Sequence, residues 1–300
     1  MMVVPAVPSP VHPFKRFIAA FFESKTALVG SALLLLILIA AIFAPVLAPQ
    51  NPYDLAQLDI SDTRLAPGSP SADGARVYWL GTDEQGRDML SAILYGLRVS
   101  IGVGASATLL ALALGMTLGL IAGFFGGRIE ALIMRIADIQ LSFPAILIAL
   151  ILLAILGRGT EKIVLALVLV QWAYYARTMR SAAIVERRKE YIEAARLLGL
   201  STPRILFRHL LPNCLPPLIV IAALQVAAAI TLEATLSFLG LGLPPTEPSL
   251  GLLISNGFQY MLAGKYWISF FPGLALLLTI VSVNLVADQL RDVLNPRLQA

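Results

Sequence analysis

Six apolar runs constrain this sequence more than any other feature. They cover residues 27–48, 100–125, 131–156, 163–175, 215–239 and 267–287. A helix needs about 20 apolar residues to cross the hydrocarbon core of a bilayer. Only 13% of the residues are charged, whereas an ordinary soluble domain has about 25%. We therefore expect an all-α membrane protein with six transmembrane helices.

The charged residues indicate which side of the membrane each polar segment occupies. Residues 50–98 hold seven acidic and four basic residues, whereas 177–208 hold eight basic and three acidic ones. Lysine and arginine collect in cytoplasmic loops close to the spans. The 177–208 stretch is therefore expected inside and the 50–98 segment outside. An even number of spans then places both termini in the cytoplasm.

These expectations divide the chain into parts. The first apolar run is too long and begins too late for a cleaved signal peptide, so it predicts a retained helix. The segment after it is rich in proline, glycine and aspartate, which predicts a small folded external cap. In chain order we expect a cytoplasmic tail (1–26), the first helix (27–48), the external segment (49–98), a five-helix domain (99–290) with a polar loop (177–212), and a cytoplasmic C-terminal tail (291–300).

The cytoplasmic loop predicts two short helices joined by a turn. Residues 190–198 favour a helix with Glu193, Ala194 and Ala195 at its centre, and Gly199 is expected to end it, because glycine adopts the left-handed conformation without steric cost. Composition alone leaves two interpretations open. The small alanines could admit a docking partner, or the loop could be a solvated basic segment that only sets topology.

Leu211 and Pro212 follow this loop and predict a break before the fifth span. The spacing of Glu193-Ala194-Ala195, Gly199 and Leu211-Pro212 resembles the EAA loop of ABC-importer permeases. His209 departs from the pattern, because the family often has isoleucine there.

The resemblance extends along nearly the whole chain, to the C-type permease subunits for dipeptides, oligopeptides and nickel. In those subunits a tryptophan often stands at the position of Leu250. The similar stretches are Leu80-Gly81-Thr82-Asp83, Gly86-Arg87-Asp88, Tyr95-Gly96, Leu236 to Gly242, and the ending Asn284, Asp288, Leu290-Arg291-Asp292 and Asn295-Pro296.

The resemblance implies half of a translocation pathway for dipeptides or oligopeptides in the bacterial inner membrane, with nickel or another small solute as an alternative cargo. It implies four kinds of partner: a homologous second permease, two cytoplasmic ATPases, an external solute-binding protein and the lipid bilayer. ATP and magnesium would bind the ATPases, with no cofactor on this chain. The chain has no Gly-x-x-x-x-Gly-Lys-Ser/Thr phosphate loop, which agrees with a non-catalytic subunit.

A stripe of small residues runs along the second apolar run at a step of four. Its members are Ala107, Ala111, Gly115, Gly119 and Gly123. Small residues allow two membrane helices to approach closely. The stripe could form a moving interface with the partner permease, but static helix packing inside this subunit is the favoured interpretation.

Two acidic residues lie within the apolar runs, where a charge costs roughly 2.5–3.5 kcal/mol. Glu233 could face the pathway and meet the amine of a peptide, or it could be a helix-end carboxylate that pairs locally. Asp138 is expected to be structural and to pair with Arg135.

Other chemistry is poorly indicated. Asp83, Glu84 and Asp88 do not have EF-hand spacing and predict a solvated, capped turn before Met89. His12 and His209 are far apart, so no metal site is expected.

A proton-coupled secondary transporter or channel, with Glu233 as its titrating group, remains the alternative function. It would explain the intramembrane acid but not the EAA loop.

Overall fold

A computed structural model describes residues 13–54, 58–244 and 246–294. The ends of both predicted tails, 1–12 and 295–300, lie outside the described residues, and so do His12, Asn295 and Pro296. The helical elements are α1 (Pro13–Glu23), α2 (Lys25–Ile42), α3 (Ala44–Leu47), η2 (Ile60–Asp62), α4 (Met89–Phe125), α5 (Gly127–Leu141), α6 (Ala145–Leu156), α7 (Thr160–Glu186), α8 (Glu190–Leu197), α9 (Thr202–Arg204), the π-helical η3 (Ile205–Leu210), α10 (Leu211–Phe238), α11 (Leu250–Phe258) and α12 (Trp267–Leu294). Two short strands, β1 (Ser69–Pro70) and β2 (Val77–Tyr78), pair antiparallel.

The protein is a bundle of long apolar helices. Within the described part of the chain, four helices are long and apolar enough to cross a membrane: α2, α4, the continuous helix 202–238, and α12. The pair α5 and α6 adds a fifth crossing if the two are counted as one span. The predicted fourth span lies in α7, which carries Gln171, Arg177 and Arg180 and is not among these candidates.

The third apolar run is not one straight helix, because its axis bends by 93° between α5 and α6. Pro144 explains the bend. Proline disfavours the helical conformation of the residue before it, here Phe143, and cannot donate a helical hydrogen bond itself. Ser142 Oγ also donates to the Asp138 carbonyl oxygen, 2.7 Å away, which satisfies an acceptor where the helix ends.

The second long helix starts earlier than its apolar run. α4 begins at Met89, so the predicted boundary at 98–99 falls inside it. Asp88 caps the helix, since its carboxylate accepts from the backbone N–H of Ser91 at 2.8 Å and from the Ser91 hydroxyl at 2.6 Å. The cap predicted before Met89 is confirmed, but the predicted exposure of the turn to solvent is wrong, because Asp83 and Asp88 are buried.

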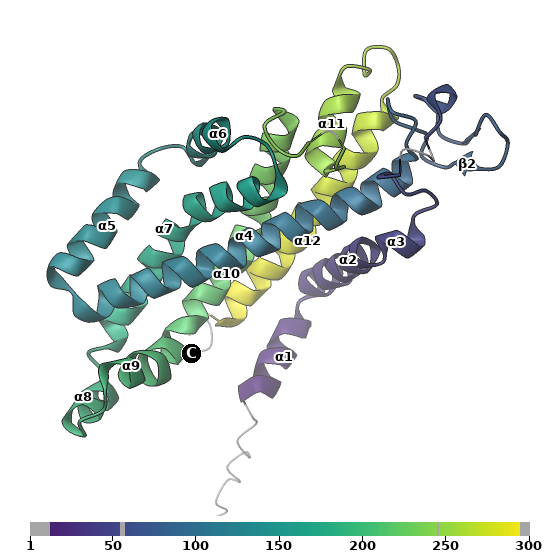
Figure 1. Cartoon of the computed structure of the whole chain (residues 1–300). Coiled ribbons are helices and arrows are strands. Elements are labelled where there is room, and N and C mark those ends of the chain that lie inside the picture. The colour runs from purple at the N-terminus through teal and green to yellow at the C-terminus, as the bar shows by residue number, and fades with distance from the viewer. Residues whose placement is uncertain (1–12, 55–57, 245, 295–300) are drawn as a thin grey trace, which may run out of the picture.

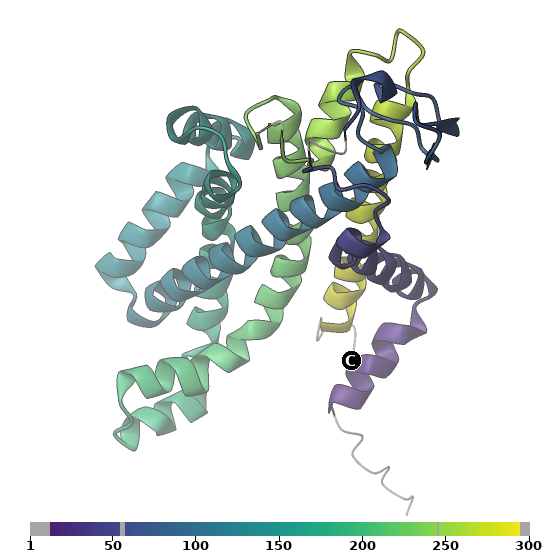
Figure 2. The same cartoon turned by 45° about the vertical axis from the view of Figure 1, so that its right-hand side comes forward.

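The bundle has two distinct ends. Figures 1 and 2 show α8 and α9 at one end, which we call the loop end, and β2 and α11 at the opposite one, the cap end. The long helices α4, α10 and α12 run between them.

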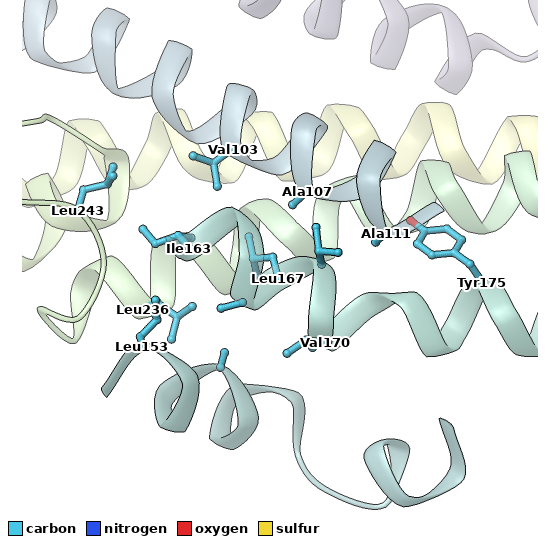
Figure 3. Packing of buried hydrophobic residues seen from close by; sticks show 13 residues of the cluster. Val103, Ala107, Ala111, Leu153, Ile163, Leu167, Val170, Tyr175, Leu236 and Leu243 are labelled. Carbon is cyan, nitrogen blue, oxygen red and sulfur yellow. The ribbon is translucent and has the colours of Figure 1, made fainter. Parts of the chain in front are cut away.

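The contact between α4 and α7 forms the centre of the bundle. Figure 3 shows Val103, Ala107 and Ala111 of α4 against Ile163 and Leu167 of α7.

Three glycines extend this contact toward the loop end. A Cβ atom at Gly119 would lie 2.4 Å from the Ala176 carbonyl oxygen, and Gly115 and Gly123 are equally tight against α7. In this structure the small-residue stripe therefore packs two helices of the same subunit.

Candidate functional site

The loop between α7 and α10 folds into a helical hairpin at the loop end. Its first helix, α8, contains Glu193, Ala194 and Ala195, and Gly199 follows with φ +70°. The N–H of Leu200 donates to the Ala195 carbonyl oxygen at 3.2 Å, and the N–H of Gly199 donates to the Arg196 carbonyl oxygen at 3.0 Å. This pair of bonds is a Schellman motif, which requires a left-handed residue where glycine stands.

The two faces of α8 have different surroundings. Ile192 and Ala195 are buried and pack with Ile205, Leu206 and Leu210 of the second half of the hairpin. Glu193 and Ala194 point away from that cluster and are exposed. One face of α8 is thus packed inside the hairpin, and the other face is exposed.

The tip of the hairpin exposes large apolar side chains. Leu197 is 89% exposed, Leu198 79% and Phe207 58%. The two leucines end a charged helix with Glu190, Glu193 and Arg196, and Phe207 follows on the second arm of the hairpin. Exposed apolar side chains beside charged residues are typical of a protein–protein contact. We call Ala194, Leu197, Leu198 and Phe207 the tip surface.

The prediction of a break at Leu211 and Pro212 is wrong. The helix is continuous from Thr202 to Phe238, with α10 starting at Leu211 and Pro212 in its first turn. Two local features accommodate the proline. The π-helical η3 widens the turn before it, and Asn213 Nδ2 donates to the His209 carbonyl oxygen at 2.7 Å. The hairpin is therefore joined rigidly to α10.

A second connection involves side chains that sequence reasoning missed. The Tyr191 hydroxyl donates to Glu186 Oε1 at 2.7 Å and accepts from Asn213 Nδ2 at 3.2 Å. Lys189 Nζ lies 2.8 Å from Glu186 Oε2. Burial and the Glu186 carboxylate raise the pKa of Tyr191, so it keeps its proton. The network joins the end of α7, the start of α8 and the start of α10.

Two arginines counted as topology signals also hold helices together. Arg180 of α7 pairs with Glu130 in the first turn of α5. Arg187 Nη1 donates to the carbonyl oxygens of Gly123 and Phe124, at 2.7 and 3.0 Å, where α4 ends. Sequence spacing could not have shown these partners, because each lies 50 or more residues away along the chain.

The predicted partner of Asp138 was wrong. Asp138 pairs with Arg177 of α7, with 2.6 Å between Oδ1 and Nη2, and not with Arg135. Arg135 lies one turn earlier on α5 itself, whereas packing of α5 on α7 brings Arg177 within reach.

Glu233 lies near the C-terminal end of α10 and is fully buried. Its Oε1 accepts from the Ser237 hydroxyl at 2.7 Å, and Ser100 of α4 and Ser249 before α11 lie beside the carboxyl group. Its surroundings are thus side chains of this subunit.

The acids of the external segment have structural partners. Asp83 and Arg87 form a buried ion pair, with 2.6 Å between Oδ2 and Nε. Glu84 accepts a long hydrogen bond from the Tyr260 hydroxyl at 3.4 Å. Burial and the neighbouring Asp83 raise the pKa of Glu84. Among the described residues no three His, Cys, Asp or Glu side chains are grouped as metal ligands.

Two protein families match different stretches of the chain. Residues 115–300 match the family of binding-protein-dependent transport system inner membrane components. Residues 12–67 match the N-terminal TM domain of oligopeptide transport permease C.

Whole-chain relatives are permeases. The di/tripeptide transport system permease protein of Pseudomonas aeruginosa is 40% identical over 97% of this chain and 95% of that protein. The dipeptide transport system permease protein of Escherichia coli K12 is 41% identical over 98% and 96%. The protein of the same name from Haemophilus influenzae is 36% identical over the full length of both.

A solved structure has a similar fold. A chain of the MetNI methionine ABC transporter, in inward-facing conformations, superposes with a TM-score of 0.55 at 18% identity. The match covers 69% of this chain and 98% of that one.

Proposed function

Because this chain belongs to the family of binding-protein-dependent transport system inner membrane components, we propose that it forms half of the pathway of an ATP-driven importer for dipeptides. The dipeptide assignment follows its relatives, which are named as dipeptide or di/tripeptide permeases. Oligopeptides remain an alternative cargo, as do nickel and other small solutes. The chain itself acts as a transport subunit, and hydrolysis of ATP belongs to partner ATPases.

We propose six membrane crossings in the inner membrane. The four long apolar helices, the bent pair α5–α6 and the 27-residue α7 together make six. The excess of basic residues in the hairpin supports a cytoplasmic position for the loop end and for both termini. The cap end faces the external solute-binding protein in this arrangement.

The observation that carries the proposal is the exposed hairpin at the loop end. Its Glu193, Ala194, Ala195 and Gly199 have the spacing of an EAA loop, and its tip surface is apolar and uncovered. An ATPase that covers the tip surface would bury this apolar area, and the exposed Glu193 would help to orient it.

The rigid joints of the hairpin explain how a push on it would reach the pathway. η3 continues into α10 without a break, and the Tyr191 network holds α8 to α7 and α10. A displacement of the hairpin by two closing ATPases would therefore move α7 and α10 together. Leu211 and Pro212 contribute as the first turn of α10, where they transmit the movement.

Glu233 would reach the pathway only if α10 turned, since its carboxyl group is enclosed by α4 and the segment before α11. We propose that it holds α10 to these neighbours. The alternative, a proton-coupled transporter with Glu233 as its titrating group, gives the hairpin no role. Gly115, Gly119 and Gly123 are proposed to keep α4 and α7 together while the bundle moves.

Uptake by reconstituted vesicles tests the proposal. The chain would be reconstituted with its partner permease and ATPases, and labelled dipeptide uptake measured with the binding protein outside. We expect uptake to require ATP at the ATPase side. Uptake that persists without ATP and follows a proton gradient would establish the alternative.

A charge reversal tests the docking role. Glu193→Lys, like Gly199→Asp, should abolish co-purification of the ATPases while leaving membrane insertion intact. Glu161→Lys is the matched control, because Glu161 is an exposed acid at the opposite end of α7. Normal transport in Glu193→Lys would refute the docking role. So would an equal loss of ATPase co-purification in Glu193→Lys and Glu161→Lys.

A further inference from the structure

A cavity of about 350 Å³ lies between the stretch after α3, α4, the start of α7 and the loop before α11. The side chains that line it include an arginine, a glutamate, a threonine and two tyrosines: Arg98, Glu247, Thr160, Tyr53 and Tyr95. Pockets for small ligands are typically about 300 Å³ or larger. The cavity therefore has room for a molecule such as a short peptide.

This cavity lies at the helix ends that are remote from the hairpin. Thr160 is the first residue of α7, whose other end leads into the hairpin, and Glu247 follows the C-terminal end of α10, whose first turn adjoins the hairpin. Arg98 lies in the third turn of α4. In the proposed orientation the cavity is on the external side, where the binding protein would release its cargo.

Arg98 and Glu247 give the cavity two opposite charges that do not neutralise each other. Among the described residues neither side chain forms an ion pair. Arg98 is exposed and Glu247 is partly exposed. The Thr160 hydroxyl donates to Glu247 Oε2 at 2.9 Å, which holds the carboxylate in place. Both charges are therefore within reach of a molecule in the cavity.

Two tyrosines stand beside these charges. The rings of Tyr53 and Tyr95 pack edge to face, with 5.3 Å between their centroids. Partial burial and then the negative charge of Glu247 raise the pKa of Tyr53, whereas Arg98 acts to lower it. The Tyr53 hydroxyl thus keeps its proton at neutral pH and can donate a hydrogen bond to a carboxylate or carbonyl oxygen.

We propose that this cavity is an external binding site for a zwitterionic short peptide, in which Arg98 binds the C-terminal carboxylate and Glu247 binds the N-terminal ammonium group. The planar fork of donors on arginine matches a carboxylate. The two ends of an extended dipeptide are about 7 Å apart, which suits two opposite charges that are not paired with each other. The inference rests on the proposed function and adds a recognition site to it.

The lining disfavours nickel as the occupant. It has one carboxylate and no histidine or cysteine, and its arginine repels a cation. The headgroup of phosphatidylethanolamine carries the same pair of charges as a dipeptide, because it has a phosphate and an ammonium group. The lipid composition is therefore varied in the test.

Photolabelling with glycyl-photoleucine, a diazirine dipeptide with both termini free, tests the site. The chain is placed in lipid nanodiscs with its partner permease and ATPases. The binding protein is left out, so that its own preference for peptides does not contribute. Mass spectrometry measures the labelling of the residues that line the cavity, and its inhibition by Gly-Ala, by the C-terminal amide of Gly-Ala and by N-acetyl-Gly-Ala.

Each blocked terminus should remove one charge pair. We expect the amide and the acetyl peptide to need concentrations about 5- to 15-fold higher than Gly-Ala for half inhibition, a modest effect for charged hydrogen bonds because Arg98 is exposed. In Arg98→Gln the amide should compete as well as Gly-Ala, while the acetyl peptide stays weaker. Glu247→Gln should show the opposite pattern, and Arg98→Lys should keep the wild-type order.

Arg158→Gln and Glu161→Gln are the matched controls. Both residues are exposed and flank Thr160 in the chain, but neither lines the cavity. They remove the same charges close to the site, so they should keep the wild-type pattern of competition. If they changed the pattern as much as Arg98→Gln and Glu247→Gln do, the assignment of the two termini would be wrong.

The wild type alone can overturn the site, whether or not a variant assembles. No labelling of the lining, or equal competition by all three peptides, would do so. Labelling in discs of phosphatidylglycerol that is lost in discs with phosphatidylethanolamine would assign the cavity to the lipid headgroup and not to a peptide. The proposed function survives these results if vesicles with the complete transporter still take up Gly-Ala with ATP, whereas uptake that needs no ATP would overturn that function instead.

Discussion

Replacing Gly199 by alanine tests whether the turn of the hairpin depends on a left-handed backbone. Gly199 has φ +70°, and a Cβ atom there would meet nothing within 4 Å. Any effect therefore arises from the backbone and not from a clash. A left-handed conformation costs a residue with a Cβ about 1–2 kcal/mol, which corresponds to a factor of roughly 5–30 in an equilibrium constant.

Gly199→Asn is the matched control. Asparagine tolerates the left-handed region better than alanine does. Both substitutions restrict the unfolded chain relative to glycine, so that contribution largely cancels between them. We expect the larger destabilisation for alanine and a clearly smaller one for asparagine.

The hydrogen-exchange rate of the Leu200 amide measures the destabilisation of the turn directly, because this N–H closes the turn by donating to the Ala195 carbonyl oxygen. The permease would be measured in lipid nanodiscs without ATPases. Gly199→Ala should speed this exchange by about 5- to 30-fold relative to wild type. Equal rates in the alanine and asparagine variants, or no change with alanine, would refute the account of the turn.

Three further predictions concern packing and charge. Ala195→Leu should lower the thermal unfolding midpoint in detergent, because overpacking a buried site costs about 1–3 kcal/mol; the exposed Ala194→Leu should leave the midpoint unchanged and weaken ATPase binding. Gly119→Ala should destabilise the α4–α7 contact, whereas Gly102→Ala, whose Cβ atom meets nothing within 4 Å, should be neutral or stabilising in the same assay. Since the pKa of Glu84 is raised above its ordinary value of 4.5, the folded cap holds this proton more tightly than the unfolded chain. Stability of the cap should therefore fall as pH rises through that raised pKa, which would be seen as faster hydrogen exchange in the cap, and Glu84→Gln should reduce this pH dependence. Identical behaviour of the paired variants, or an unchanged pH profile, would count against these three.

Local rules explain which features of the fold were predictable. The apolar runs identified the long helices because each must satisfy its backbone within the bilayer. Gly199 and Asp88 could be placed because a helix end and a helix cap depend on residues a few positions away.

The features that were missed depend on contacts between distant segments. The π-helical turn before Pro212 and the bond from the Asn213 side chain to the His209 carbonyl oxygen have no sequence signature. The ion pair of Asp138 with Arg177 could not be read from spacing, since packing of α5 on α7 creates it.

Site-specific photo-crosslinking tests whether the hairpin docks an ATPase while the cap end faces the binding protein. A benzophenone amino acid would replace Leu198 of the tip surface, 79% exposed, or Trp79 of the cap, 71% exposed, in the assembled transporter with its binding protein. We expect the probe at 198 to crosslink an ATPase and the probe at 79 to crosslink the binding protein. A crosslink from 198 to the binding protein, or from 79 to an ATPase, would contradict both the orientation and the docking role of the hairpin.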